Sequence, residues 1–509
     1  MLATVPTFAL IGIEPRRVDV EVDVRPGLPS FTIVGLGDRS VREARERVAA
    51  AIVNSGMKVP QQRITVNLAP AGLHKSGPGF DLAIACGVLA ASGVIRPADL
   101  AGVAVHGELA LSGEVRAARG TLVVAEGAQA HGLEHLLVAP DRLGEANLLD
   151  GVTGVPAADL RAVVRVLSGG PPTGTATSSP PGAEPEEADH TGPDLIDVRG
   201  HAASLEAVTV AAAGGHNLLL SGPPGTGKTM LARRIPSILP PLGPHEALEV
   251  TRIASVAGVA TGGRLLRVRP FRAPHHSISS AGLVGGGSIP RPGEVTLAHA
   301  GVLFLDELSE FPRGTLEALR QPLEDGRVLV TRGQQSVLFP CRTMLVAATN
   351  PCPCGYGGTA RCRCTTHEHD RHRRRLSGPL LDRIDLTVRV DRPTAEELAA
   401  PPLRTSAAER ERVAEARDRQ ARRLAGTDVL CNAHLDARLL RLHLALDDLA
   451  ERQLARVYER GLLSARGRHR VLRVARTIAD LAASDRVHVP HLLSALALRE
   501  DTGADEEAA

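Results

Sequence analysis

The chain has 509 residues, of which 43% are hydrophobic, and a formal net charge of +2 at pH 7. At roughly 150 residues per domain this length predicts about three domains, and so small a charge does not by itself indicate a nucleic-acid partner. The first residues lack the basic and apolar regions of a signal peptide, and no apolar run reaches the roughly 20 residues that cross a membrane. We therefore expect a cytoplasmic protein without a membrane partner, whose seven cysteines stay reduced.

Residues 1–167 are predicted to form one domain of mixed helices and strands. Residues 17–24 alternate apolar and polar side chains with the period of two that is typical of a half-buried strand. The other elements expected here are strands at residues 31–34 and 64–68 and helices at residues 38–52 and 81–89.

A stretch rich in Pro, Gly, Ser and Thr, residues 168–193, divides the chain and is predicted to be a flexible linker. The following segment, residues 194–393, places short apolar strands between helical stretches, as in a P-loop core with a parallel sheet. These strands are expected at residues 217–220, 302–305 and 344–348.

Residues 394–500 are rich in Ala, Leu, Arg and Glu with helical spacing. They predict a helical C-terminal lid, and residues 501–509 form a tail. The expected fold class is therefore α/β, with an N-terminal α+β domain, a linker, a parallel-sheet core and a helical lid.

A phosphate-binding loop follows the first strand of the core and begins a helix. Its glycines let backbone N–H groups surround phosphate oxygens, and the start of the helix adds positive partial charge. The lysine would reach the β- and γ-phosphates of ATP, and the threonine hydroxyl would bind Mg²⁺. Only three lysines occur beside 56 arginines, and one of them stands at this position, which needs a compact ammonium. The full Walker A pattern consists of Gly222, Pro223, Pro224, Gly225, Thr226, Gly227, Lys228 and Thr229.

Two acids follow the predicted strand at residues 302–305. Asp306 is expected to hold Mg²⁺ and Glu307 to polarise the attacking water; two acids that only cap a following helix are the alternative. Asn350 ends the next strand and is placed to orient that water, unless it only forms a turn before Pro351.

Several motifs resemble those of the ComM/YifB family of magnesium-chelatase-like AAA+ ATPases, and the resemblance covers nearly the whole chain apart from the linker. The motifs include SGPPGTGKTM, RPFRAPHHSISSAGLVGGG, GVLFLDELSEF, ATNPCPCG, SGPLLDRIDL and SARGRHRVLRVARTIADL. The resemblance implies an AAA+ core, an N-terminal domain related to the Lon protease domain, and ring-shaped homo-hexamers. It also implies that Asn350 is sensor 1, that Arg383 is an arginine finger presented to a neighbouring subunit, and that Arg466 is sensor 2.

ComM-type members of this family are DNA branch-migration motors, so the resemblance implies single-stranded or branched DNA as the partner. The alternative is a magnesium-chelatase-like ATPase that remodels a protein partner. A protease activity is not expected, because Gly79 stands where the Lon-like nucleophile belongs and no lysine stands near Leu122.

Four cysteines form two C-x-C pairs that precede His367, His369 and His372. Four thiolates suit tetrahedral Zn²⁺; a structural loop without metal and redox sensing are the alternatives. The cysteines are Cys352, Cys354, Cys362 and Cys364. The arginines that follow, at residues 371–375, are either a solvated surface, a phosphate contact with DNA or a contact with a neighbouring nucleotide.

Two further segments exceed what a minimal P-loop core needs. One is glycine-rich and contains Gly285; the other, residues 327–339, is a predicted hairpin with Arg332 at its turn and Arg327 at its base. Because binding residues gather on loops of a rigid scaffold, we expect these three residues to contact DNA. Such segments line the central pore of helicase-like AAA+ rings. The tandem His275 and His276 are expected to pack or to line that pore rather than to form a metal pair, because no third ligand is nearby.

Overall fold

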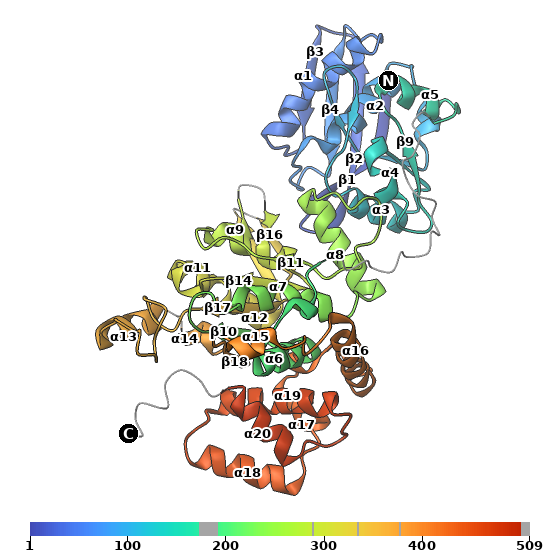
Figure 1. The fold of residues 1–509 in the computed structure, drawn as a ribbon. Helices are drawn as coiled ribbons and strands as arrows, with labels where there is room; N and C mark the ends of the chain where they lie inside the picture. Colours follow the sequence, from blue (N-terminus) through green and yellow to red (C-terminus); the bar gives the residue numbers. More distant parts are fainter. Residues whose placement is uncertain (173–191, 288–289, 333–334, 376–377, 500–509) are drawn as a thin grey trace.

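The computed structural model describes residues 1–172, 192–287, 290–332, 335–375 and 378–499. Most of the predicted linker, the tail at residues 501–509 and the side chain of Arg332 lie outside the described residues. The described regions are stacked along one long axis, with the N-terminal domain at one end, the core in the middle and the C-terminal helices at the other end (Figure 1).

The N-terminal domain contains a four-stranded sheet in the order β1-β2-β4-β3 and a three-stranded sheet in the order β5-β8-β9. The strands and helices predicted for this domain are present, and the structure adds β1, α3, β8, α4, β9 and α5 to them. The elements are β1 (Leu2–Ile11), β2 (Glu14–Arg25), β3 (Ser30–Val34), α1 (Arg39–Asn54), β4 (Arg63–Ala69), α2 (Asp81–Ala91), β5 (Val103–Val105), β6 (Glu108–Leu109), β7 (Val115–Arg116), α3 (Thr121–Ala130), β8 (His135–Val138), α4 (Leu143–Ala146), β9 (Thr153–Pro156) and α5 (Leu160–Leu167).

Local sequence explains how this domain begins its helices and closes its core. Asp38 caps α1 by accepting a hydrogen bond from the backbone N–H of Val41 at 2.9 Å, and Asp159 caps α5 in the same way. All residues of α2 are buried, because this helix lies between α1 and the strands β1 and β2. A helix that is apolar on all sides requires such cover on more than one face.

The core is a five-stranded sheet in the order β11-β14-β17-β10-β18, and all its neighbouring pairs are parallel. This confirms the α/β class. Parallel strands bring the segments that follow them to one edge of the sheet, which we call the carboxyl edge. The elements are α6 (Ala202–Gly214), β10 (Leu218–Ser221), α7 (Lys228–Ile238), α8 (Pro244–Ala257), β11 (Phe271–Arg272), α9 (Ser280–Val284), β12 (Gly285–Gly286), β13 (Arg291–Pro292), α10 (Glu294–Leu297), β14 (Val302–Leu305), α11 (Arg313–Ala318), α12 (Arg320–Asp325), β15 (Arg327–Arg332), β16 (Gln335–Pro340), β17 (Met344–Thr349), α13 (Thr366–Arg375), α14 (Gly378–Leu381) and β18 (Leu386–Arg389).

The C-terminal helices share their hydrophobic core with the sheet. Val208 of α6, Val346 of β17, Val413 of α16 and Val474 of α19 belong to one cluster of buried residues. The hydrophobic core is therefore continuous across the predicted domain boundary near residue 393. The helices are α15 (Ala395–Ala399), α16 (Ser406–Arg423), α17 (Ala437–His443), α18 (Asp448–Glu459), α19 (Ala465–Leu481) and α20 (Val489–Ala497).

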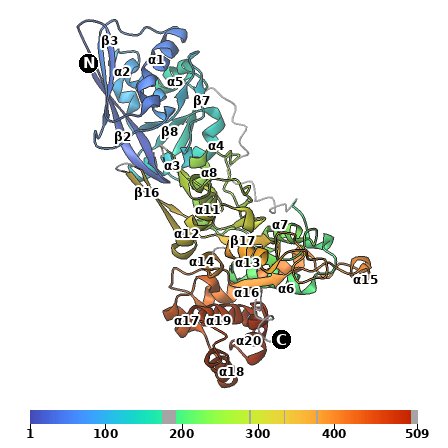
Figure 2. The same ribbon diagram turned by 90° about the vertical axis from the view of Figure 1, so that its left-hand side faces the viewer.

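The N-terminal domain contacts the core at α8 and at the hairpin β15–β16 (Figure 2). The hydroxyl of Ser255 on α8 donates to Glu145 at 2.7 Å, and the side chain of Glu145 is buried. Ile11 and Ile13, at the turn between β1 and β2, pack against the cluster that contains Val337 and Phe339 of the hairpin. Within the described ranges, no helix combines the length and the apolar character needed to cross a lipid bilayer.

Candidate functional site

The predicted phosphate-binding loop, residues 222–229, joins β10 to α7 at the carboxyl edge of the core sheet. Gly225 and Gly227 have φ angles of 74° and 92°, in the left-handed region that residues with a Cβ rarely adopt. Ser221 and Gly222 continue the strand pattern, since the backbone N–H of Gly222 donates to the carbonyl of Thr349 at 3.3 Å. The loop thus starts beside the end of β17.

Lys228 is the first residue of α7, and its side chain folds back over this loop. Its ammonium donates to the carbonyl oxygens of Gly222 at 2.6 Å and Pro223 at 2.8 Å, and to Oδ1 of Asn350 at 3.2 Å. Burial lowers the pKa of the Lys228 ammonium, and the negative charge of Asp306 opposes that change. The lysine predicted to contact phosphates and the asparagine predicted to orient water are therefore direct neighbours.

Thr229 and Asp306 are also neighbours, and two side chains that bind one Mg²⁺ ion must lie close together. The hydroxyl of Thr229 donates to Oδ2 of Asp306 at 2.7 Å, across the gap between α7 and the end of β14. A hydroxyl and a carboxylate are the hard oxygen donors that Mg²⁺ prefers. The two side chains fit the ion, and they are the residues that would hold it.

Glu307 follows Asp306 in a left-handed conformation, with a φ of 51°. Its backbone N–H donates to Oδ1 of Asp306 at 2.9 Å, and its side chain is 59% exposed. Oε2 of Glu307 lies 3.6 Å from Nδ1 of His276. The strand order explains this contact, because β11 lies beside β14 and the segment after β11 reaches the same edge.

This contact gives His276 a position that the sequence did not predict. The ring of His276 contacts two other rings. Its centroid lies 4.0 Å from that of His275 and 6.4 Å from that of Phe311. His275 instead contacts the hydroxyl of Ser277 at 2.8 Å. The two adjacent histidines therefore have different surroundings, and only the contact of His276 includes the proposed catalytic carboxylate.

Asn350 is held on both sides. Besides the side-chain contact with Lys228, its backbone oxygen lies 2.9 Å from Nε2 of His372, a buried residue of α13. His372 was predicted only as part of a histidine- and arginine-rich run. Another residue that the sequence did not single out, His201, lies near the loop: a Cβ added to Gly227 would be 3.5 Å from its Nε2.

Arg383 and Arg466 lie away from this cluster. Arg383 precedes β18, which runs parallel to β10, so Arg383 lies at the amino edge of the sheet, opposite the phosphate-binding loop. Its guanidinium forms an ion pair with Glu324. Arg466 is exposed at the start of α19, one turn before Arg470, which donates to the carbonyl of Ile384 at 3.1 Å. Both predicted arginines thus lie toward the amino edge.

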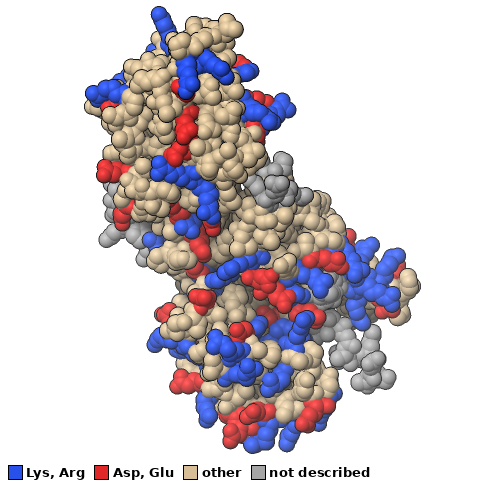
Figure 3. Space-filling model, turned by 180° about the vertical axis from the view of Figure 1, so that it is seen from behind, with Lys and Arg blue, Asp and Glu red and all other residues tan. Residues whose placement is uncertain are grey.

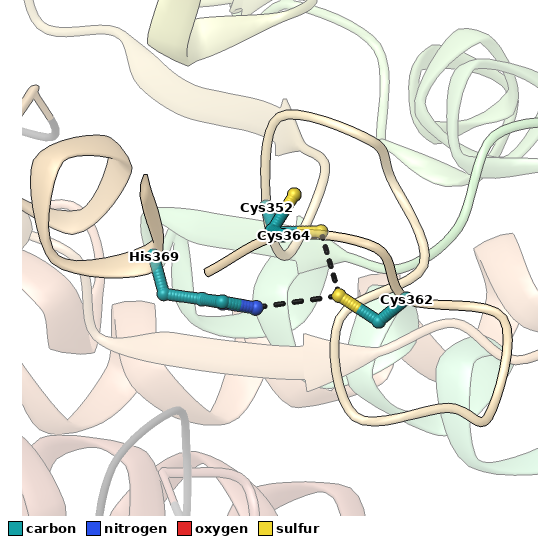
Figure 4. Close-up of side chains that lie close together, drawn as sticks. All are labelled: Cys352, Cys362, Cys364 and His369. Atoms are coloured by element: carbon teal, nitrogen blue, oxygen red, sulfur yellow. Dashed lines mark hydrogen bonds between the residues drawn. The ribbon is translucent and has the colours of Figure 1, made fainter. Parts of the chain in front are cut away.

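The four predicted cysteines lie in the loop between β17 and α13, and His369 of α13 lies beside them. Figure 4 shows three of these cysteines, Cys352, Cys362 and Cys364, together with His369. Sγ of Cys352 lies 3.3 Å from Sγ of Cys354 and 3.8 Å from Sγ of Cys362. Sγ of Cys362 lies 3.3 Å from Nε2 of His369, and Sγ of Cys364 accepts from the backbone N–H of Cys354 at 3.4 Å. All are free thiols.

The predicted hairpin is present as β15 and β16, paired in register from Arg327 with Pro340 to Arg332 with Gln335. Val328 and Val330 face the core, whereas Arg327 and Leu329 are exposed. Gly285 is not at a free tip. It pairs with Pro292 in a short ladder, and a Cβ added to it would lie 2.7 Å from the carbonyl oxygen of Arg291.

The N-terminal domain has no room for a nucleophile at Gly79. A Cβ at this residue would lie 2.8 Å from Cε1 of His106, so a serine side chain would displace that buried ring. Lys75 is fully buried, and its ammonium donates to the carbonyl of Pro70. The absence of protease activity in this domain stays a prediction.

Comparisons with known proteins cover almost the whole chain. Family models match residues 20–142 ("Subunit ChlI of Mg-chelatase"), 194–398 ("Magnesium chelatase, subunit ChlI") and 404–499 ("Magnesium chelatase, subunit ChlI C-terminal"). The chain is 41% identical over 500 residues to the competence protein ComM of Haemophilus influenzae, which covers 98% of this chain and 97% of that protein. It is 42% identical over 500 residues to the uncharacterized protein YifB of Escherichia coli, with the same coverage. An uncharacterized protein of Mycobacterium tuberculosis is 42% identical over 506 residues, or 98% of each chain.

Proposed function

The chain belongs to the ComM/YifB family of magnesium-chelatase-like AAA+ proteins, and from this premise we propose that it is an ATP-hydrolysing ring motor that acts on DNA as a branch-migration helicase. One observation carries the ATPase part of the proposal. Lys228, Thr229, Asp306 and Asn350 come from the ends of three neighbouring parallel strands, and their side chains contact one another in two pairs.

Each residue of this cluster has a defined task. Lys228 would neutralise charge on the phosphates, and Asn350 holds the ammonium in place from the side of β17. Thr229 and Asp306 would hold Mg²⁺, which supplies positive charge to the phosphate oxygens when it is bound. Glu307 would accept a hydrogen bond from the attacking water, and its exposed side chain faces away from the core.

Each subunit would supply only part of a complete site. The charge that develops on the transferred phosphoryl group is commonly stabilised by an arginine. Arg383 and Arg466 lie toward the amino edge of the sheet, away from the loop of their own subunit. In a head-to-tail ring, the amino edge of one subunit would face the carboxyl edge of the next, and the contact closes into a ring when the rotation allows it. We infer a homo-hexamer, in line with the family resemblance.

The hairpin β15–β16 is the surface that we assign to DNA. It presents Arg327 and, beside it, the exposed side chains of the paired residues Leu329 and Leu338. An arginine beside an apolar surface suits a nucleic-acid backbone and its bases better than an apolar surface alone. The name of the relative from Haemophilus influenzae links that protein to competence, which agrees with DNA as the substrate.

The test is the ATP-dependent movement of a three-stranded DNA junction, with ATPase rates measured with and without single-stranded or branched DNA. We expect junction movement, and DNA affinity should fall by about 0.7–0.9 log units per log unit of salt for each phosphate contacted. Arg327→Ala should weaken binding on all sequences alike while basal hydrolysis stays unchanged. Arg96→Ala is the matched control, because Arg96 is an exposed arginine of the N-terminal domain paired with Asp99.

A wild-type protein that hydrolyses ATP, but neither moves the junction nor responds to any DNA, would refute the DNA part. The remodelling of a protein partner, the activity suggested by the chelatase family models, would then take its place. A wild-type ring without hydrolysis would refute the ATPase part.

A further inference from the structure

We propose that Cys352, Cys362, Cys364 and His369 bind one zinc ion, and that this ion anchors helix α13 beside the end of β17. The four potential ligand atoms, three Sγ and one imidazole nitrogen, all lie within 4.8 Å of one another. They come from the loop that follows Asn350 and from the second turn of α13. The proposal does not depend on the DNA or ATPase function, since metal content can be measured on its own.

The distances match the size of a tetrahedral zinc site. With Zn–S of about 2.3 Å and Zn–N of about 2.0 Å, neighbouring ligand atoms of a tetrahedron lie roughly 3.5–3.8 Å apart. Sγ of Cys352 and Sγ of Cys362 are 3.8 Å apart, and Sγ of Cys362 and Nε2 of His369 are 3.3 Å apart (Figure 4). A disulfide, by contrast, needs about 2.05 Å between its sulfur atoms.

The structure favours His369 over Cys354 as the fourth ligand. Nε2 of His369 is directed at Cys362, and a neutral imidazole that binds through Nε2 keeps its proton on Nδ1. Sγ of Cys354 is the competing ligand, at 3.3 Å from Sγ of Cys352 and 3.7 Å from Sγ of Cys362, but the set whose ligand atoms all lie within 4.8 Å of one another contains His369 instead. The backbone N–H of Cys354 donates to Sγ of Cys364 at 3.4 Å. Such a bond stabilises a ligating thiolate from outside the coordination sphere. The sequence alone predicted the four cysteines, so the assignment of His369 comes from the fold.

Binding would proceed with three thiols losing their protons to solvent and the imidazole remaining neutral. Three thiolates and one Zn²⁺ leave a local charge of about −1, whereas four thiolates would leave about −2. The segment around the site is rich in exposed arginines, which compensate either value. These are Arg361, Arg363, Arg371, Arg373, Arg374 and Arg375.

Helix α13 needs such an anchor. It spans ten residues, and His372 is its only buried residue. Isolated helices shorter than about 12–15 residues are marginal in water, and four arginines at its C-terminal end add mutual repulsion. The helix projects sideways from the core (Figure 1), and its basic side chains form part of the blue region at the right-hand edge of Figure 3.

The anchor also bears on the proposed ATP site. His369 and His372 are three residues apart and lie on neighbouring positions of one helix face. His372 contacts the backbone oxygen of Asn350 at 2.9 Å, and the side chain of Asn350 contacts Lys228. A metal bound at His369 would therefore fix the residue that holds Asn350.

The test is metal analysis of the full chain, expressed with added zinc and purified with a reductant and without chelators. We expect one zinc per subunit in the wild type. Cys362→Ser and His369→Ala should reduce the zinc content at least tenfold. Cys354→Ser and His367→Ala are matched controls in the same loop and helix, and they should keep one zinc each. Far-UV circular dichroism would show whether each variant is folded.

A second measurement uses the unchanged chain. Co²⁺ in place of zinc should give the visible spectrum of a tetrahedral ion and a thiolate charge-transfer band of the size expected for three thiolates. Wild-type protein that contains no zinc and gives no such Co²⁺ spectrum would overturn the proposal. Zinc lost from Cys354→Ser and kept by His369→Ala would overturn the ligand assignment in favour of four cysteines.

Discussion

Arg383 offers a sharp test of the proposed ring, because the sheet places it too far from the phosphate-binding loop of its own subunit. Residues Leu218–Ser221 of β10 pair in register with Leu386–Arg389 of β18. Three steps along these strands, at about 3.3 Å each, separate the two edges by roughly 10 Å. Arg383 precedes the first pair and Lys228 follows the last, so the real separation is larger. We therefore propose that Arg383 acts on a nucleotide across an interface between subunits.

We therefore expect Arg383→Ala and Lys228→Ala to abolish hydrolysis separately and to complement each other when mixed. Loss of a finger that acts in trans costs about 10³–10⁵-fold in rate. In a random one-to-one mixture, about a quarter of the interfaces join an intact loop to an intact finger. Activity should then recover to about a quarter of the wild-type rate per subunit, provided that the sites work independently.

The assay is steady-state phosphate release after the two variants are unfolded or dissociated together and reassembled. A mixture of Arg383→Ala with the double variant Lys228→Ala/Arg383→Ala is the control and should stay inactive. Reassembled rings that remain inactive at every mixing ratio would refute the placement of Arg383 in a neighbour's site. The placement would also be refuted if the wild-type protein were shown to be monomeric and still hydrolysed ATP at a rate per subunit that does not depend on protein concentration.

Three further changes test the site and the packing. Glu307→Gln should lower turnover by about 10²–10⁴-fold, because it removes the carboxylate that would polarise the attacking water. The affinity for ATP should not change, because the contact between Thr229 and Asp306 is kept. Near-normal hydrolysis in a phosphate-release assay would contradict the role of Glu307. His276→Ala should lower kcat by about tenfold with KM unchanged, since it removes the neighbour of the Glu307 carboxylate. His275→Ala is the control. Equal effects of the two variants would indicate that His276 acts only through packing. Asp480→Ala should destabilise the C-terminal helices by about 3–5 kcal/mol in urea unfolding, because the guanidinium groups of Arg423 and Arg476 lose their shared buried carboxylate. The control is Glu415→Ala, which removes an exposed ion pair with Arg419 and should cost about 1 kcal/mol or less. An equally small loss for Asp480→Ala would argue against a stabilising role of these buried ion pairs.

Hydrophobic periodicity identified some strands of the N-terminal domain and missed others, and for β1 the reason is physical. In β2, Val18, Val20, Val22 and Val24 are buried and the residues between them are not, so the alternation is visible in the sequence. β1 has a run of buried residues on both faces and contains Pro6. Its pattern lacks alternation, and proline argues against a central strand. β1 is an edge strand paired with β2 alone, where a proline is tolerated.

For the candidate site, local motifs predicted the positions of residues that come from one segment of the chain, and their roles stay predictions. The loop at residues 222–229 and the acids after β14 were predicted in place, and the structure brings Thr229 to Asp306 and Lys228 to Asn350. The contact of His276 with Glu307 depends on β11 lying beside β14, and strand order cannot be read from spacing. The fourth ligand of the proposed zinc site depends on how α13 folds back onto the cysteine loop.

The parallel sheet separates two kinds of residue that the proposed reaction needs together. The groups that we propose to bind the nucleotide follow the strands, and the arginines that would neutralise charge lie toward the edge where β18 begins. An isolated subunit would therefore bind ATP but hydrolyse it poorly, since its own Arg383 and Arg466 lie toward the opposite edge of the sheet from the phosphate-binding loop. Assembly would complete the site, and any movement between neighbours would change the distance between the two halves. Because the N-terminal domain rests on α8 and on the hairpin β15–β16 of the same subunit, such a movement would carry the hairpin and this domain with it. In the proposed ring, this arrangement would connect hydrolysis at one interface directly to displacement of the surface that we assign to DNA.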